Sequence, residues 1–228
     1  MKKAMIVVGC TVWVLIVIVV AVAIMTTLSD RGKARKPVLY VYPQVEQRLT
    51  VTLDLEGTLD TVYPAPDSVR AADGRTQASW TLDAAPNGTL TGLSGRTYPS
   101  LFWDGQMVVP DPEQGFVVSR DDAVPFLEDK LSQLGLNDRE AADFITYWAP
   151  RMRAHEYTFV SFDATAYTQR VSYRFADEAD NEIAPDSFIR VFMTIREADA
   201  TTVAQPQTFA APPVRTGFTA VEWGGAER

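Results

Sequence analysis

The chain offers few side chains for nucleophilic or metal-based chemistry, because its 228 residues include one histidine and one cysteine. A Ser–His–Asp site needs a base beside its nucleophile, and His155 is the one candidate of that type. It follows a predicted helix and precedes a predicted strand, and the chain has no Gly-x-Ser-x-Gly motif. We therefore interpret His155 as a surface or capping residue. Cys10 lies in an apolar segment and is expected to face lipid, so a cysteine nucleophile and a zinc site are excluded. We expect no cofactor.

Carboxylates are the remaining candidates for catalysis, because a glycosidase requires only two of them at a fixed separation. Asp104 and Glu222, each beside a tryptophan, form the first pair to consider. However, Asp104-Gly105 is a typical turn dipeptide, and Glu222 is expected to alternate out of a strand whose neighbouring side chains point the other way. The sequence therefore predicts no catalytic residues, and a carboxylate-dependent hydrolase acting on cell-surface glycan remains the alternative.

A calcium site is the one metal centre that the composition permits, because calcium takes only oxygen ligands. Residues 177–182 contain four carboxylates, and Asp177, Asp180 and Glu182 are the candidate ligands. The segment lacks the glycine and the ligand order of a known calcium loop. We interpret it as the solvated tip of a hairpin and predict no bound metal.

Aromatic side chains are frequent, and exposed aromatic platforms bind sugars and peptides. In a domain of this size most aromatic residues are expected in the core; the large ones are Tyr40, Tyr42, Trp80, Tyr98, Phe102, Trp103, Trp148 and Trp223. Phe102 and Trp103 are adjacent, so in a strand they point to opposite faces and one of them needs an unusual environment. Together with Asp104 and Glu222, they form the predicted binding residues.

Short alternating segments separated by turn dipeptides predict an antiparallel sandwich or meander. Residues 38–42 and 47–55 are predicted strands, and Leu49, Val51, Leu53 and Leu55 share one face of the second. The turn dipeptides are Asp73-Gly74, Asn87-Gly88, Ser94-Gly95 and Asp104-Gly105. Further strands are predicted at 157–162, 170–175, 187–195 and 217–223, and a loop at 199–214.

A helical hairpin at about residues 121–149 interrupts these strands. Its first helix is predicted to begin at Asp121 or Asp122 and to end at Gly135, with an apolar stripe of Val124, Leu127, Leu131 and Leu134. Asn137 and Glu140 resemble a capping box at the start of the second helix. That helix is expected to bury Ala141, Phe144, Ile145 and Trp148 and to end at Pro150. The predicted fold class is α+β, mainly antiparallel and sandwich-like, with this hairpin inserted and one N-terminal transmembrane helix.

Residues 4–28 predict that transmembrane helix, because they carry no charge. As a helix they would span roughly 37 Å, against about 30 Å for the hydrocarbon core of a bilayer. Ala21-Val22-Ala23 matches a signal-peptidase site, but apolar residues continue beyond it, which favours an uncleaved anchor. Residues 1–3 would then be cytoplasmic, 29–36 a basic juxtamembrane linker and 37–225 the globular domain.

The charge of the globular part limits its partners. Residues 37–228 contain 15 of the 21 Lys and Arg but 28 of the 29 Asp and Glu, a net charge of −13. This field repels nucleic acid, so we expect no nucleic-acid partner. The count of basic residues flanking the apolar segment favours a cytoplasmic domain, whereas a short basic start before an apolar run is typical of export. We predict that the domain is extracytoplasmic, with a cytoplasmic-facing membrane adaptor as the alternative.

Three segments resemble landmarks of one uncharacterised bacterial family of membrane-anchored or exported proteins. They are residues 36–43 (KPVLYVYP), 98–105 (YPSLFWDG) and 221–225 (VEWGG), where the family has a KPVIYLYP-type start and a YLFW[ED]G-type motif. The resemblance covers nearly all of residues 36–225 and implies a bacterial protein, with no established activity. We therefore expect a single-pass cell-membrane protein whose domain binds or scaffolds an unknown protein or cell-envelope glycan.

Overall fold

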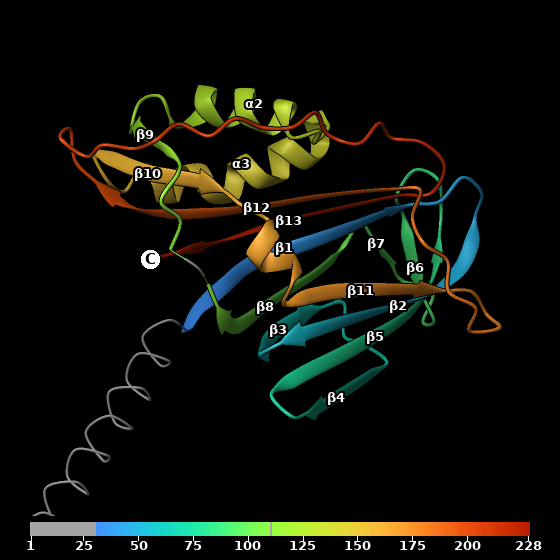
Figure 1. Cartoon of the computed structure of the whole chain (residues 1–228). Coiled ribbons are helices and arrows are strands. Elements are labelled where there is room, and N and C mark those ends of the chain that lie inside the picture. Colours follow the sequence, from blue (N-terminus) through green and yellow to red (C-terminus); the bar gives the residue numbers. More distant parts are fainter. Residues whose placement is uncertain (1–30, 110) are drawn as a thin grey trace, which may run out of the picture.

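The computed structural model describes residues 31–109 and 111–228, and it consists mostly of β-sheet, with 48% strand and 15% helix. The predicted transmembrane helix at 4–28 lies outside the described residues. Within the described ranges, no helix is long and apolar enough to cross a membrane. The described part is arranged in three layers, in which a helical hairpin covers one face of a large sheet and a second sheet covers the other (Figure 1).

Sheet A is the central layer and has seven strands in the order β3-β8-β1-β13-β12-β10-β9. Their bounds are β1 Arg31–Tyr42, β3 Thr58–Tyr63, β8 Leu101–Val108, β9 Phe116–Ser119, β10 Tyr157–Phe162, β12 Ser187–Ala198 and β13 Thr219–Glu227. Neighbouring strands are antiparallel, as predicted, except that β12 and β13 are parallel. A parallel pair requires a long return connection, which the predicted loop at 199–214 supplies.

Sheet B packs against one face of sheet A and has the order β11-β2-β5-β6-β7, with β4 also paired to β5. Its strands are β2 Gln47–Glu56, β4 Ser68–Ala72, β5 Arg75–Ala84, β6 Leu90–Gly92, β7 Thr97–Tyr98 and β11 Val171–Ala176. The predicted apolar face of β2 is confirmed, because Leu49, Val51, Leu53 and Leu55 are all buried in the core between the sheets. The polar face of β2 lies on the other side, so sheet B has one buried face and one face directed to solvent.

The helical hairpin covers the other face of sheet A (Figure 1). It comprises α2 Ala123–Gln133 and α3 Asp138–Met152, and a short α4, Thr165–Thr168, precedes β11. The capping box of Asn137 and Glu140 is confirmed, and Gly135 follows α2 with a φ of 91°. Pro150 does not end α3 as predicted. Its exposed ring occupies the last turn, and the helix continues to Met152 because the Arg153 amide still donates to the Ala149 carbonyl.

Glu140 ties three separated segments together at the start of α3. Its side chain is fully buried and accepts hydrogen bonds from the Asn137 amide and the Tyr42 hydroxyl, both at 2.9 Å. Arg215, which follows the long loop, forms an ion pair with the same carboxylate. The loop that joins β12 to β13 is therefore fastened to the helical hairpin.

Two predictions that concern β1 and its partner β8 are wrong. Residues 31–36 are not a linker, because β1 begins at Arg31 and pairs with β8 from its first residue. Asp104-Gly105 is not a turn, because both residues lie inside β8. Asp104 accepts a 2.6 Å hydrogen bond from the Lys36 amide, where β1 has a bulge and Lys36 has a φ of 50°. Gly105 is required by close packing, because a Cβ there would lie 2.6 Å from the Thr58 carbonyl oxygen.

By contrast, Asp73-Gly74 forms the predicted β-turn, with both φ angles positive.

The packing of the helical hairpin on sheet A generates the first prediction. Leu131 and Phe144 are both fully buried against sheet A. Replacing either with alanine should lower the free energy of unfolding by about 2–5 kcal/mol, as for other large-to-small changes in a core. Urea denaturation measures this change. Val203→Ala is the control, because Val203 is 94% exposed. Unfolding of Leu131→Ala and Phe144→Ala at the parental urea concentration would contradict the packing.

Candidate functional site

The four predicted binding residues do not form an exposed platform. Phe102 is half-buried on the helical side of sheet A, whereas Trp103 is buried between the two sheets. Because both faces of sheet A are covered, Phe102 and Trp103 can point to opposite faces without either needing an unusual environment. Asp104 lies on the same face as Phe102 because of the strand alternation, whereas Glu222 points between the sheets. Asp104 and Glu222 therefore cannot act on one substrate as a carboxylate pair.

Glu222 points away from Val221 and Trp223, as alternation predicts, but the face that it occupies is buried, and its side chain is 1% exposed. One of its oxygens, Oε1, accepts hydrogen bonds from the hydroxyls of Tyr167 at 2.6 Å and Tyr173 at 2.7 Å. The other, Oε2, accepts a 2.7 Å hydrogen bond from Arg190 Nε and lies 2.6 Å from Nη2 of the same guanidinium. Trp103 Nε1 donates to the Tyr173 hydroxyl at 2.8 Å. Two of the predicted residues, Trp103 and Glu222, are thus joined through Tyr173. We call these five residues the inter-sheet network.

The electrostatics of the inter-sheet network favour a structural role. Burial and the facing Glu222 carboxylate raise the pKa of Tyr167 and of Tyr173 well above the usual tyrosine value, so both hydroxyls remain neutral donors. Burial by itself would lower the pKa of Arg190, but Glu222 raises it, so the guanidinium stays charged. Arg190 Nη1 also donates to the Val171 carbonyl of β11 at 2.9 Å. The network therefore holds a fixed charge pair and links sheet A to sheet B.

Two of the three candidate calcium ligands, Asp177 and Asp180, are engaged with the protein, whereas the Glu182 side chain is exposed. Asp177 Oδ1 accepts hydrogen bonds from the Ala179 and Asn181 amides at 2.9 and 2.8 Å, and Oδ2 accepts one from Asn181 Nδ2 at 2.9 Å. These contacts, the Asn181 side chain first, lower the pKa of Asp177. Asp180 pairs with Arg174 at 2.7 Å. Over the part of the chain that the structure describes, no three histidine, cysteine or acidic side chains converge to hold a metal ion.

A surface cleft lies where the edge of sheet B is interrupted. Residues 75–79 of β5 pair with β4, and residues 82–84 pair with β6 on the same side of β5. Trp80 and Thr81 fall between these two pairings. Asp67 replaces the missing neighbour, because its Oδ2 accepts a 2.6 Å hydrogen bond from the Thr81 amide. The alternation of an antiparallel strand directs the Thr81 carbonyl oxygen to the same side.

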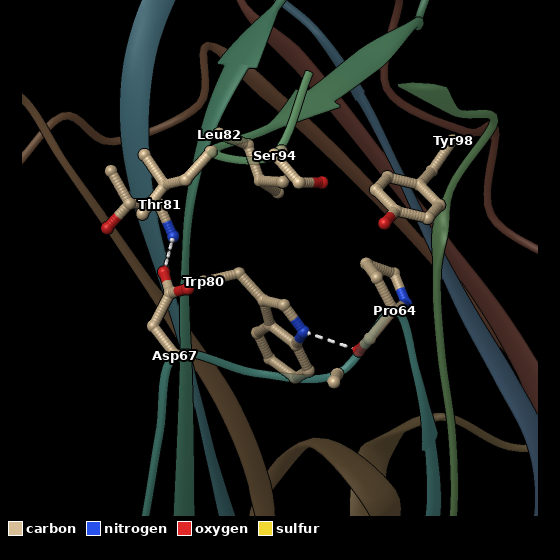
Figure 2. Close-up of a pocket in the computed structure, with 10 residues that line it drawn as sticks. Pro64, Asp67, Trp80, Thr81, Leu82, Ser94 and Tyr98 are labelled. Atoms are coloured by element: carbon tan, nitrogen blue, oxygen red, sulfur yellow. Dashed lines mark hydrogen bonds between the residues drawn. The ribbon is translucent and has the colours of Figure 1, made fainter. Parts of the chain in front are cut away.

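We call this hollow the β5 cleft, and it has a volume of about 320 Å³. It is lined by Pro64, Ala65, Asp67, Trp80, Thr81, Leu82, Gly92, Leu93, Ser94 and Tyr98. Figure 2 shows Tyr98 facing Asp67 and Thr81 across the hollow, with the Ser94 side chain also directed into it. The indole of Trp80 lies at its base, held by a 2.8 Å hydrogen bond from Nε1 to the Pro64 carbonyl oxygen.

The β5 cleft combines an apolar wall with hydrogen-bonding groups. Tyr98 is braced by an edge-to-face contact with Tyr63, with the ring centroids 5.5 Å apart, and Tyr63 is itself 47% exposed. Leu93 is 69% exposed beside them. Opposite this wall, Asp67 uses one carboxylate oxygen for Thr81 and presents the second from an exposed side chain. The cleft therefore offers a carboxylate and two hydroxyls next to aromatic surface.

Neither Asp67 nor the position of this cleft was predicted from the sequence. Trp80 is buried as predicted, yet it also lines the cleft. The signal that could have located the break is the proline pair Pro64 and Pro66, because proline interrupts strand pairing. Nothing local in the sequence shows that β4 and β6 pair with the same side of β5.

No protein-family model, no curated protein and no solved structure matches this chain. The family resemblance therefore stays a prediction that rests on the three segments at 36–43, 98–105 and 221–225.

Proposed function

We propose that this protein is a membrane-tethered, extracytoplasmic binding domain that holds a neutral glycan in the β5 cleft without chemically altering it. The observation that carries the proposal is the composition of that cleft, in which Asp67, Ser94 and the Tyr98 hydroxyl face a hollow bounded by aromatic rings. Sugar rings present hydroxyl groups around their rim and apolar C–H faces, which such a lining matches. The volume of about 320 Å³ is at the lower end for small-ligand sites.

The shape of the break favours a glycan over a peptide. An extended peptide adds to a sheet edge through a continuous row of unpaired backbone groups. On this side of β5, only Trp80 and Thr81 lie between the residues that pair with β4 and those that pair with β6. Two residues are too few for strand addition, whereas one or two sugar rings need no such row. The net charge of −13 over residues 37–228 also disfavours an acidic ligand.

The alternative of a carboxylate-dependent hydrolase has less support. Hydrolysis of a glycosidic bond requires two carboxyl groups roughly 5–10 Å apart across the bond. The lining of the β5 cleft includes one carboxylate, Asp67. Asp104 and Glu222 lie on opposite faces of sheet A. Asp104 accepts a hydrogen bond from the Lys36 amide, and Glu222 accepts one from the Arg190 side chain. Binding without turnover is therefore the better interpretation.

Substitutions in the β5 cleft test the binding proposal. Asp67→Asn keeps an oxygen for the Thr81 amide but removes the charge, and loss of a charged hydrogen bond should weaken glycan binding about tenfold or more. Tyr98→Ala removes the aromatic wall and should weaken binding by a similar factor, whereas Tyr98→Phe should have a smaller effect. The measurement is titration of the full chain in nanodiscs with a panel of cell-envelope glycan fragments, followed by calorimetry.

Asp121→Asn is the matched control, because Asp121 is exposed and the substitution removes the same charge elsewhere on the surface. It should leave glycan affinity unchanged. Binding that survives both Asp67→Asn and Tyr98→Ala would place the site elsewhere. Product formation from a glycan fragment that ceases on substitution of a carboxylate would replace the binding proposal with the hydrolase.

The orientation of the domain has its own test. If the domain lies outside the membrane, protease added to intact protoplasts should degrade it without lysis. The count of basic residues around residues 4–28 favours a cytoplasmic domain instead, so this experiment distinguishes the two orientations directly. Protection of the domain until lysis would contradict the extracytoplasmic proposal and favour a cytoplasmic-facing adaptor. A cytoplasmic marker protein provides the control for protoplast integrity.

A further inference from the structure

A second hollow, which we call the arginine hollow, carries the opposite charge character to the rest of the domain. It has a volume of about 300 Å³ and is lined by Arg151, Ala154, His155, Ile195, Arg196, Glu227 and Arg228. The lining of the hollow thus includes three arginines and one carboxylate, Glu227. By contrast, the lining of the hollow beside α2 and α3 includes Glu128 and Asp138 but no cationic side chain. The lining of the β5 cleft likewise includes Asp67 but no cationic side chain.

The guanidinium groups of the arginine hollow are held in place partly by neutral partners. Arg151 donates to the Tyr147 carbonyl and lies over the Tyr147 ring at 3.6 Å, and Arg228 donates to the Val109 carbonyl. Such contacts orient a guanidinium without cancelling its charge. The neighbouring carboxylates are Glu227, 3.4 Å from Arg151; Asp111, 3.1 Å from Arg196 and 3.9 Å from Arg228; and Glu197, 3.7 Å from His155. The three arginine side chains are 23–34% exposed, so donors remain accessible.

The arginine hollow lies at the end of the domain where β1 begins. Arg35 of β1 pairs with Gly225 of β13, and its guanidinium shares Glu227 with Arg151. Figure 1 shows the start of β1 and the C-terminus at the same end of the sandwich. The chain from Leu28 to Arg31 can span at most about 10 Å, so an anchor at residues 4–28 would hold this end at the membrane surface.

We infer that the arginine hollow binds the phosphate group of an anionic phospholipid in the membrane that anchors the chain. Guanidinium groups match the geometry of phosphate oxygens, and basic side chains near an anionic bilayer attract it within a Debye length of about 8–10 Å. The inference rests on the membrane tether in the proposed function, but not on glycan binding. Its consequence is that the domain has a fixed orientation on the bilayer, with the arginine hollow facing the headgroups.

The test uses the full chain in nanodiscs made of phosphatidylcholine with or without phosphatidylglycerol, followed by native mass spectrometry of the released protein. The parent should retain phosphatidylglycerol, and each of Arg151→Gln, Arg196→Gln and Arg228→Gln should weaken retention by about fivefold. The triple variant Arg151→Lys, Arg196→Lys and Arg228→Lys keeps the charge and should retain most of the lipid. Circular dichroism of each variant checks that the fold is intact.

The matched control is the triple variant Arg48→Gln, Arg75→Gln and Arg174→Gln, which removes three arginines paired with carboxylates on sheet B. It should retain lipid as the parent does. Equal retention of phosphatidylglycerol by the parent and by the arginine-hollow variants would overturn the lipid assignment. So would inorganic phosphate that protects the parent and these variants equally against unfolding in phosphatidylcholine nanodiscs. If the chain enters no nanodisc, the membrane tether itself fails and the inference fails with it. If the chain enters nanodiscs but shows no lipid preference, only the inference fails.

Discussion

The ion pair between Glu222 and Arg190 is the contact on which the arrangement of the two sheets depends. Removing either charge from water costs several kcal/mol, so each requires the other and further hydrogen bonds. Those partners come from both layers: Glu222 and Arg190 belong to β13 and β12 of sheet A, whereas Tyr173 and the Val171 carbonyl belong to β11 of sheet B. The charges are satisfied only when β11 lies opposite the centre of sheet A. Apolar burial provides most of the driving force for folding, and this polar contact selects one placement of the sheets.

The same placement creates the conditions for the β5 cleft. With β11 fixed at one edge of sheet B, the opposite edge is formed by β4, β6 and β7, which are too short to cover β5 completely. The uncovered step at Trp80 and Thr81 is closed at its base by the Trp80 indole and on one side by Asp67. An interrupted edge is also protected against edge-to-edge pairing with another chain, because no long row of backbone groups is presented. The cleft can therefore be exposed without making the sheet prone to aggregation.

Local patterns predicted most elements but not the environment of their side chains. Alternation located the buried face of β2, and the apolar stripe located α2, because each depends on one period and one buried face. Alternation also placed Glu222 opposite its neighbours, but it could not show that this face is buried, because sheet A is covered on both sides and nearly every residue of β13 is buried. The run of small and apolar residues around Glu222 is typical of a strand that is buried on both faces, so it indicates that the Glu222 side chain is buried too. Asp104-Gly105 matched a turn for a different reason: its glycine is needed where Thr58 approaches, a long-range contact that a dipeptide cannot show. The two candidate sites depend on contacts between distant segments, which local patterns cannot show.

A double-mutant cycle on Glu222 and Arg190 tests most directly whether the buried pair couples the sheets. Glu222→Gln keeps the shape but leaves Arg190 uncompensated, and it should lower the free energy of unfolding by about 3 kcal/mol or more. Adding Arg190→Met should recover much of that loss, because an apolar replacement removes the stranded charge. Asp83→Asn, which breaks the surface pair with Arg48, is the control and should leave the denaturation curve nearly unchanged. Unfolding of Glu222→Gln at the parental urea concentration would contradict the account, because the sheets would then be held together without the charge pair.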